Sequence, residues 1–315
     1  MTGHRGTAES RAAVLGAEEA WERLLRVRSE ADAESAGLLR DADGRLRWRD
    51  ASPAAAALAD RYLPLCLAGP RTTFAQLGQS LDGFIATRKG DADYVTGAQD
   101  REHLHRLRAL ADAVVVGAGT AVADDPRLTV RACAGQHPVR VVLDPHGRVP
   151  LRRKVFTDGV APTLWVVGAD SAGAESVGGA ESAGSVGGVE GVGGVDVLTL
   201  PDSAAFAPRR LVHELARRGL GRVLVEGGGV TVSRFLHAGA LDRLYVTVAP
   251  VLIGDGVPGI GFPGPDLMRD ALRPAVRRGV LGEDTLFELD LRTPHPGEPL
   301  DGEHPEPRQA RDEGQ

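Results

Sequence analysis

The sequence predicts an α/β fold, in which helices cover a sheet of buried strands. Continuous apolar runs rich in β-branched residues are typical of strands buried on both faces, and such runs occur at 113–116, 138–144, 163–168 and 222–226. Helical patterns at 103–111 and 208–219 alternate with these runs. Glycine turns directly follow two strands, at 117–120 and 227–229. Open α/β sheets hold ligands at the carboxyl ends of their strands, so these turns mark a candidate binding site.

Composition and charge exclude several classes of function. The chain has 315 residues, which fits one large domain or two small ones. Its content of 42% hydrophobic and 25% charged residues is that of an ordinary soluble protein. No apolar stretch approaches the roughly 18 residues that a membrane helix needs, and we expect a cytoplasmic protein. A net charge of −6 argues against binding nucleic acid through its phosphates.

The cysteines and histidines do not predict a metal site. Neither Cys66 nor Cys133 belongs to a C-x-x-C pair, which favours a reduced intracellular protein. His103 and His105 are two residues apart, so they do not share a helix face, and no third ligand is spaced nearby. We therefore expect no bound metal.

Residues 1–70 are predicted to form an N-terminal helical extension. Trp21, Leu24 and Leu25 fall on one face of a helix within 18–28. A second helix is expected from Pro53, because proline is favoured in a first helical turn. The apolar content of this extension is too small for an independent core. Two roles stay open: an arm that supports packing or dimerisation, and a lid over a binding site.

The main domain is predicted to span residues 71–292. Its first strand begins at Thr72 and is followed by a turn at 81–83 and a second apolar run. A tract at 169–196, rich in Gly, Ser, Ala, Val and Glu, cannot bury enough apolar area to offset its ordering entropy, so a disordered insertion is expected. Residues 293–315 form a charged, proline-containing segment that is expected to be a disordered tail.

The second glycine turn has the physical features of an anion site. A strand at 222–226 leads into Gly227, Gly228 and Gly229, and a helix pattern follows from 230 to 238. Backbone N–H groups and the positive end of a helix dipole then meet at one point, as the seating of a pyrophosphate requires. Downstream, 244–251 is predicted to be a strand, 254–264 a loop and 286–291 the final strand.

Four ordered blocks of sequence carry a family resemblance. They are SLDGFIA at 80–86, HRLRALADAVVVGAGTAVADDPRLTVR at 105–131, VVLDPHGRVP at 141–150 and LVEGGGVTVSRFLHAGALDRLYVTVAPVLIGDG at 224–256. Together they resemble the C-terminal reductase domain of bacterial riboflavin biosynthesis proteins. The resemblance implies a dihydrofolate reductase-like mixed sheet flanked by helices. It also implies a homodimer, with an interface around 244–262, and NADPH-dependent reduction of a ribosylamino-pyrimidine phosphate to the ribitylamino compound.

The resemblance also implies roles for particular residues. The cofactor would be bound by Gly117, Gly119, Thr120, Asp144, Arg148, Gly227, Gly228 and Gly229. The substrate would be bound by Ser80, Phe84, Arg108, Asp125, Leu128 and Arg131. Glu226 and Asp82 are the candidate catalytic carboxyls, with water as the other source of the proton. For Arg148 a place as an exposed loop arginine stays equally open, and Asp124-Asp125-Pro126 also has the composition of a plain turn.

The chain departs from the family pattern at two points. Phe84 stands where the family has a basic residue that is thought to face the substrate. The zinc deaminase signature, H-x-E followed by P-C-x-x-C, does not occur, so deamination is not expected of this sequence. Two further functions therefore stay open: a paralogue that reduces another imine or N-heterocycle, and a non-catalytic nucleotide-binding dimer partner.

Overall fold

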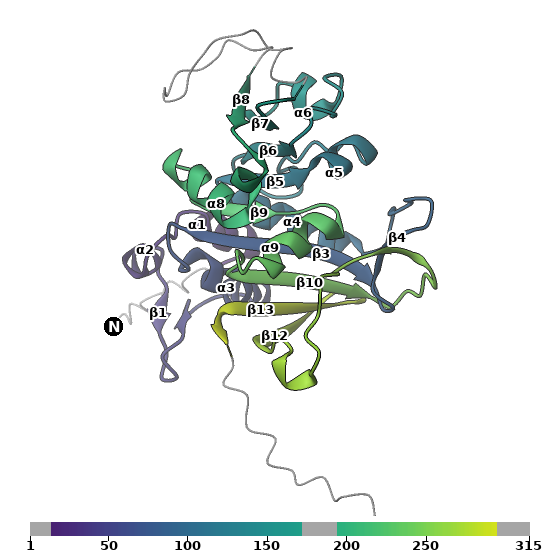
Figure 1. Cartoon of the computed structure of the whole chain (residues 1–315). Helices are drawn as coiled ribbons and strands as arrows, with labels where there is room; N and C mark the ends of the chain where they lie inside the picture. The colour runs from purple at the N-terminus through teal and green to yellow at the C-terminus, as the bar shows by residue number, and fades with distance from the viewer. Residues whose placement is uncertain (1–13, 172–193, 295–315) are drawn as a thin grey trace, which may run out of the picture.

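A nine-stranded sheet organises the molecule in the computed structural model, which describes residues 14–171 and 194–294. The strand order is β12-β13-β10-β3-β9-β5-β6-β7-β8. The seven strands from β10 to β8 are parallel, while β13 is antiparallel to β10 and β12 is antiparallel to β13. Figure 1 shows this sheet passing through the whole molecule, with helices on its two faces. The predicted mixed sheet flanked by helices is confirmed.

The elements follow the sequence pattern closely. The strands of the large sheet are β3 (Thr72–Ser80), β5 (Ala113–Gly117), β6 (Val139–Asp144), β7 (Thr163–Gly168), β8 (Val195–Leu200), β9 (Arg222–Val225), β10 (Arg243–Ala249), β12 (Pro274–Leu281) and β13 (Asp284–Pro294). Two small pairs are β1 (Leu39–Arg40) with β2 (Leu46–Arg47), and β4 (Phe84–Thr87) with β11 (Gly256–Pro258). The helices are α1 (Ala17–Leu24), α2 (Glu30–Ser35), α3 (Pro53–Cys66), α4 (Ala98–Leu110), α5 (Ala118–Ala123), α6 (Lys154–Thr157), α8 (Pro208–Arg217) and α9 (Gly229–His237), with single 3₁₀ turns η1 (Ser203–Phe206) and η2 (Met268–Asp270).

Alternation along the buried strands divides the interior into two cores. Val114 and Val116 of β5 pack in a cluster with residues of α1, α3 and α4. Ala113 and Val115, which point to the other face, pack in a second cluster with residues of α8 and α9. Because both faces are covered, the central parallel strands contain continuous apolar runs, such as 113–116 and 223–225, and these runs make them recognisable in the sequence.

The segment before β3 packs against the sheet. The hydroxyl of Ser52 accepts a hydrogen bond from Ala55 N at 3.2 Å and begins α3, with Pro53 in its first turn. Trp21 and Tyr62 belong to the same core cluster as Phe74 of β3, so residues 14–70 share a core with the main domain. None of the described residues in this segment lines the large cavity presented below, which argues against its action as a lid there.

The structure differs from the sequence predictions at element boundaries. The tract predicted to be disordered, 169–196, ends in residues that already belong to β8, because Val195 pairs with Thr163 of β7. Residues 172–193 of that tract lie outside the described part, as do residues 295–315 of the predicted tail, whereas 293–294 end β13. The extension contains the β1–β2 hairpin as well as helices. Strand β12 was not predicted, because its Arg-rich, largely exposed sequence lacks an apolar face.

Candidate functional site

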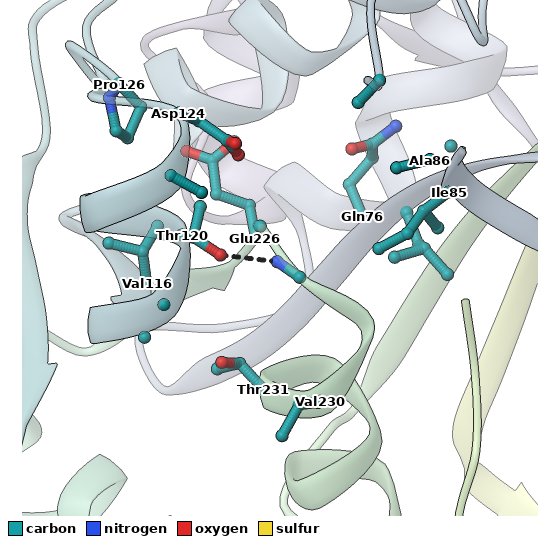
Figure 2. A pocket seen from close by; sticks show the side chains of 18 of the residues that line it. Gln76, Ile85, Ala86, Val116, Thr120, Asp124, Pro126, Glu226, Val230 and Thr231 are labelled. Carbon is teal, nitrogen blue, oxygen red and sulfur yellow. Dashed lines mark hydrogen bonds between the residues drawn. The ribbon is translucent and has the colours of Figure 1, made fainter. Parts of the chain in front are cut away.

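One large cavity lies at the carboxyl ends of the central strands. Its volume is about 1110 Å³, and residues from β3, β5 and β6, from the turn after β9 and from α4, α5 and α9 line it. This is the edge where open parallel sheets bind ligands. Figure 2 shows side chains from these separate segments pointing into the same space.

The two glycine turns meet at the rim of this cavity. Thr120 in α5 accepts a hydrogen bond at its hydroxyl from Gly228 N, at 2.9 Å (Figure 2). Gly227 has φ +94°, and a Cβ there would lie 2.8 Å from the Thr120 side chain. A Cβ on Gly117 would lie 2.6 Å from Thr231 Oγ1. Glycine at 117 and 227 thus allows the start of α5 to approach the start of α9, which places both backbone turns along one wall.

The remaining glycines of the predicted cofactor site differ in their surroundings. Gly119 is exposed, lines the cavity and has no heavy atom within 4 Å of an added Cβ. Gly229 lies outside the lining, and its Cβ would lie 1.9 Å from Gly259 O. Gly119 therefore leaves the backbone open to a ligand, whereas Gly229 serves close packing against the 258–259 loop.

Arg108 and Glu226 form a buried ion pair in the cavity wall. Arg108 Nε donates to Glu226 Oε1, and Arg108 Nη2 donates to Oε2, both at 2.9 Å. The side chains are 9% and 5% exposed. Arg108 Nη1 also donates to Thr129 O at 3.2 Å. Both side-chain oxygens of Glu226 thus accept hydrogen bonds from one guanidinium, which fixes the orientation of this side chain.

A second buried carboxyl, Asp100, lines the cavity on the side of β3. Its Oδ1 accepts from Thr247 Oγ1 at 2.6 Å, and its Oδ2 accepts from Thr96 Oγ1 at 2.7 Å. Gln76 Nε2 lies 3.2 and 3.3 Å from the two oxygens. Burial raises the pKa of Asp100 above its ordinary value, against the opposing effect of these hydrogen bonds.

The predicted residues of the 80–84 turn lie outside the cavity lining. Ser80 Oγ accepts from Phe84 N at 2.9 Å and donates to Asp82 Oδ1 at 2.5 Å. Asp82 also accepts from Gly254 N at 2.7 Å. The hydrogen bond from Ser80, followed by that from Gly254, lowers the pKa of Asp82 to about 2. An exposed carboxyl with this pKa is ionised at neutral pH, so the geometry does not favour Asp82 as the proton donor.

The 125–131 segment contributes one predicted residue to the cavity. Leu128 lines it, with φ +55°, a backbone conformation that is uncommon for a residue with a side chain. Asp125 lies outside the lining and pairs with Lys154, whose Nζ is 3.2 Å from Oδ2. Arg131 is exposed outside the lining, and its Nη1 donates to Thr129 Oγ1 at 2.6 Å. Thr129 thus joins Arg131 to Arg108.

Asp144 and Arg148 form a turn beside the cavity. Buried Asp144 accepts from Arg148 N at 2.9 Å, Val149 N at 2.8 Å and Trp165 Nε1 at 3.2 Å. Arg148 is exposed, and neither residue lines the cavity. Asp144 has a structural role in this turn, while the neighbouring Pro145 and His146 reach the lining.

Sequence reasoning missed several polar residues of the cavity. Gln76 falls inside a predicted strand, whereas Asp100 lies before the helix predicted at 103–111, and nothing in their spacing relates them to each other. Asp124 was read as part of a turn, yet it lines the cavity, and partial burial together with the charge of Asp93 raises the pKa of its carboxyl. Arg234 and Thr231 follow the glycine turn on α9, and this position next to a predicted anion site was the available signal.

The described residues add two observations about other kinds of site. None of their helices has the length and apolar character that crossing a membrane requires. Within 14–171 and 194–294, no three His, Cys, Asp or Glu side chains are grouped closely enough to hold a metal ion.

Comparison with known proteins places these features in context. The family model of the RibD C-terminal domain matches residues 71–274. The chain is 34% identical over 211 residues to riboflavin biosynthesis protein RibD of Aquifex aeolicus, covering 66% of this chain and 54% of that protein. It is 36% identical over 224 residues to 2,5-diamino-6-ribosylamino-4(3H)-pyrimidinone 5′-phosphate reductase of Methanothermobacter thermautotrophicus, covering 68% of this chain and 94% of that protein. The chain thus spans about half of the bacterial relative and nearly all of the archaeal one.

Solved structures share the fold. Acinetobacter baumannii RibD, form 1, matches with a TM-score of 0.57 at 25% identity, covering 75% of this chain and 62% of that chain. A diaminohydroxyphosphoribosylaminopyrimidine deaminase/5-amino-6-(5-phosphoribosylamino)uracil reductase from Thermotoga maritima matches with a TM-score of 0.56 at 24% identity, covering 75% and 61%.

Proposed function

Because this chain belongs to the RibD C-terminal domain family, we propose that it is an NADPH-dependent reductase of a ribosylamino-pyrimidine phosphate. The archaeal relative that is nearly fully covered is named as such a phosphate reductase. The single observation that carries the proposal is the shared cavity, because both the glycine turns and the Arg108–Glu226 pair line it.

The wall of glycine turns fits a nicotinamide dinucleotide. At about 1110 Å³ the cavity exceeds the usual volume of a site for one small ligand, which supports a cofactor and a substrate together. The open backbone at Gly119 and the first turn of α9, after Gly228, provide N–H groups for phosphates. When bound, the cofactor would supply a hydride to an imine or a ring-opened aldose carbon. Arg234, exposed on α9 and lining the cavity, is available for a further phosphate.

The buried ion pair beside the second glycine turn supports substrate binding. Glu226, fixed by Arg108, presents a carboxylate that suits ribose hydroxyl groups. Arg131 is exposed next to this pair, with Thr129 between the two arginines, and suits a substrate phosphate. Asp124, whose pKa is raised, or a water molecule is the more suitable source of the proton than Asp82 or Glu226.

The position of Phe84 in the structure gives no reason to expect a different substrate. It lies outside the cavity lining, and its backbone N–H closes the turn onto Ser80. A substrate seated in this cavity would therefore be little affected by the loss of a basic residue at position 84.

We also infer a homodimer in the cytoplasm. Strand β10, within the expected interface at 244–262, is paired on both edges and has no exposed residue, so the exposed side chains of that range follow it. There Leu252 is 72% exposed and Val251 42%, with Ile260 and Phe262 also exposed. Sedimentation velocity at several concentrations tests the dimer, with Leu252→Glu expected to shift the protein to monomer.

Turnover tests the proposed reaction directly. Purified protein is mixed with NADPH and the ribosylaminopyrimidine phosphate, and the nicotinamide absorbance is followed alongside mass spectrometry of the product. We expect loss of NADPH together with a ribitylamino product. NADPH binding without any such product would contradict the proposal and favour a non-catalytic nucleotide-binding protein.

A further inference from the structure

Arg131 begins a loop without helix or strand that runs to the start of β6, called here the 131–138 loop. The Arg131 backbone N–H donates to His105 Nδ1 on α4, at 3.0 Å. Burial, followed by the charge of Arg108, lowers the pKa of His105 to about 4. The imidazole is therefore neutral at pH 7, and Nδ1 acts as an acceptor. The first residue of the loop is thus fixed to the helix that carries Arg108.

The middle of the loop is held by Trp21 of the N-terminal segment. Most side chains of the loop are exposed, so packing alone gives it little support. Trp21 Nε1 donates to Ala134 O at 2.8 Å, across 113 residues of sequence. Among residues 14–171 and 194–294, no other hydrogen bond joins the backbone of 132–136 to a different segment. The indole N–H therefore ties the loop to α1.

Gly135 allows the loop to lie close to α4 at this point. Its φ is +145°, and an added Cβ would lie 2.5 Å from Ala109 Cβ and 3.7 Å from Leu25 Cδ2. Cys133 packs against the core cluster that contains Trp21. The loop thus lies where α4 meets the N-terminal segment, and both contribute to its position.

Trp21 is itself held firmly. It is 3% exposed on α1, and Tyr62 of α3 packs edge-on against its ring, with centroids 5.3 Å apart and planes at 69°. The Arg106 guanidinium of α4 lies 5.5 Å from the Trp21 ring centroid. Tyr62 Oη lies 2.8 Å from His103 Nδ1, a hydrogen bond that fixes the tyrosine in turn. The donor that reaches the loop therefore has one defined position.

The position of the loop matters because of what its first residue does. The Arg131 side chain is exposed, and its Nη1 donates to Thr129 Oγ1 at 2.6 Å, so the backbone position decides where its other N–H groups point. A phosphate binds more tightly to a guanidinium that is already in place, because ordering it during binding costs free energy. We propose that Trp21 is a positioning residue for the substrate phosphate, acting through the 131–138 loop on Arg131. This assignment rests on the proposed reductase function and gives the N-terminal segment a part in it.

The test replaces Trp21 by a residue that keeps an aromatic ring but lacks the donor. In Trp21→Phe we expect KM for the ribosylaminopyrimidine phosphate to rise by about tenfold, the size that loss of one buried hydrogen bond allows. The kcat value and the NADPH affinity should change less than about twofold, because the loop does not line the cavity. KM for the same compound without its phosphate should also stay within about twofold.

Trp48 provides a matched control in the same segment. It is 8% exposed, and its Nε1 donates to Ala36 O at 2.9 Å, a bond that does not involve the loop. Trp48→Phe should lower the melting temperature about as much as Trp21→Phe while leaving every KM unchanged. If Trp21→Phe does not fold, Gly135→Ala moves the loop away from Ala109 and should raise KM for the phosphorylated compound in the same way.

The thiol of Cys133 reports on the loop without any substrate. Cys66 is fully buried, so labelling by a maleimide, followed by mass spectrometry, reads Cys133. The labelling rate should rise by about threefold or more in Trp21→Phe and stay unchanged in Trp48→Phe. Equal rates in all three proteins would show that Trp21 does not hold the loop, and would overturn the assignment.

The kinetic outcomes separate this assignment from the proposed reaction. An unchanged KM in Trp21→Phe overturns the assignment alone, as does an equal rise in Trp48→Phe or an equal rise for the compound without phosphate. Absence of turnover in the unsubstituted protein overturns the proposed reaction, and calorimetry then measures binding of the pyrimidine phosphate. Binding that Trp21→Phe weakens by about tenfold still supports the positioning role, whereas no binding to the unsubstituted protein overturns both.

Discussion

Arg108 and Glu226 come from segments 118 residues apart and form a two-point ion pair, with both N–O distances 2.9 Å. Arg108 lies at the end of α4, and Glu226 directly follows β9. Both side chains are almost fully enclosed in the cavity wall. The pair therefore stabilises the junction of α4 with the sheet and orients a carboxylate into the site.

Removing one partner of this pair should cost more stability than removing both. Arg108→Met leaves Glu226 as a buried, unpaired carboxylate, and we expect a loss of about 3 kcal/mol in the free energy of unfolding. The double variant Arg108→Met with Glu226→Leu should recover part of that loss, although neither protein is expected to turn over substrate. Urea denaturation of the four members of this cycle provides the measurement. Additive losses would show that the two side chains are not energetically coupled.

Alanine substitutions at Gly227 and Gly119, in the two glycine turns, should have different effects on stability and on NADPH binding. Gly227→Ala places a Cβ against Thr120 at a φ of +94°, so we expect a stability loss of about 1–3 kcal/mol. Gly119→Ala meets no neighbouring atom and lies in a helix, so stability should not fall. It should nevertheless weaken NADPH binding by about tenfold, or roughly 1.4 kcal/mol, if phosphates approach the backbone there. Urea unfolding and fluorescence titration with NADPH measure the two effects. Unchanged NADPH binding in Gly119→Ala would show that the cofactor phosphates do not approach the backbone at this position.

The stability of the protein should fall below pH 6.5 because of His103. Complete burial, together with the nearby arginines 61 and 106, lowers the pKa of His103 from 6.5 to about 3. The unfolded chain therefore takes up a proton as pH falls below 6.5, whereas folded His103 stays neutral until about pH 3. The free energy of unfolding should drop by up to about 1.4 kcal/mol per pH unit in this window from this one group.

Substitution identifies the source of that slope. His103→Gln should give a shallower loss of stability between about pH 6.5 and pH 4.5, because the titrating group is gone. The same change at exposed His213 serves as the control. Urea denaturation at intervals across this range measures the slopes. Equal slopes in His103→Gln and the unsubstituted protein would assign the pH dependence to other groups, with His105, whose pKa burial lowers to about 4, as the first to examine.

The proton donor should appear in the pH profile of turnover. Asp124 lines the cavity with a raised pKa, so an acid role requires its protonated form, and kcat should fall as pH rises through that pKa. Asp124→Asn should lower kcat by about 10²-fold and remove this descending limb. Asp93→Asn, which removes the nearby charge that raises the pKa, should shift the limb to lower pH. A limb that persists in Asp124→Asn would assign the proton to water or another group.

Much of the fold follows from local sequence patterns. Runs such as 113–116 and 223–225 are apolar throughout because both faces of the parallel strands are covered, and glycines 117 and 227 follow them. Strand β12 escaped prediction because it lies at the sheet edge, where solvent removes the demand for an apolar face. The ends of the insertion and the tail were misplaced because strand pairing with β7 and β12 extends order beyond what composition indicates.

The sequence by itself determined the sheet, the two glycine turns and the presence of Arg108 and Glu226 near a site, since each depends on local pattern or on an ordered motif. Only the tertiary structure decided which polar groups face each other. Asp100 meets Thr247 across 147 residues of sequence and Gln76 across 24. No periodicity relates positions that distant, because strand order and helix placement set their contact. The tertiary structure also places Asp82, Asp125 and Asp144 outside the cavity. There each carboxylate accepts a hydrogen bond from a backbone N–H group that needs an acceptor.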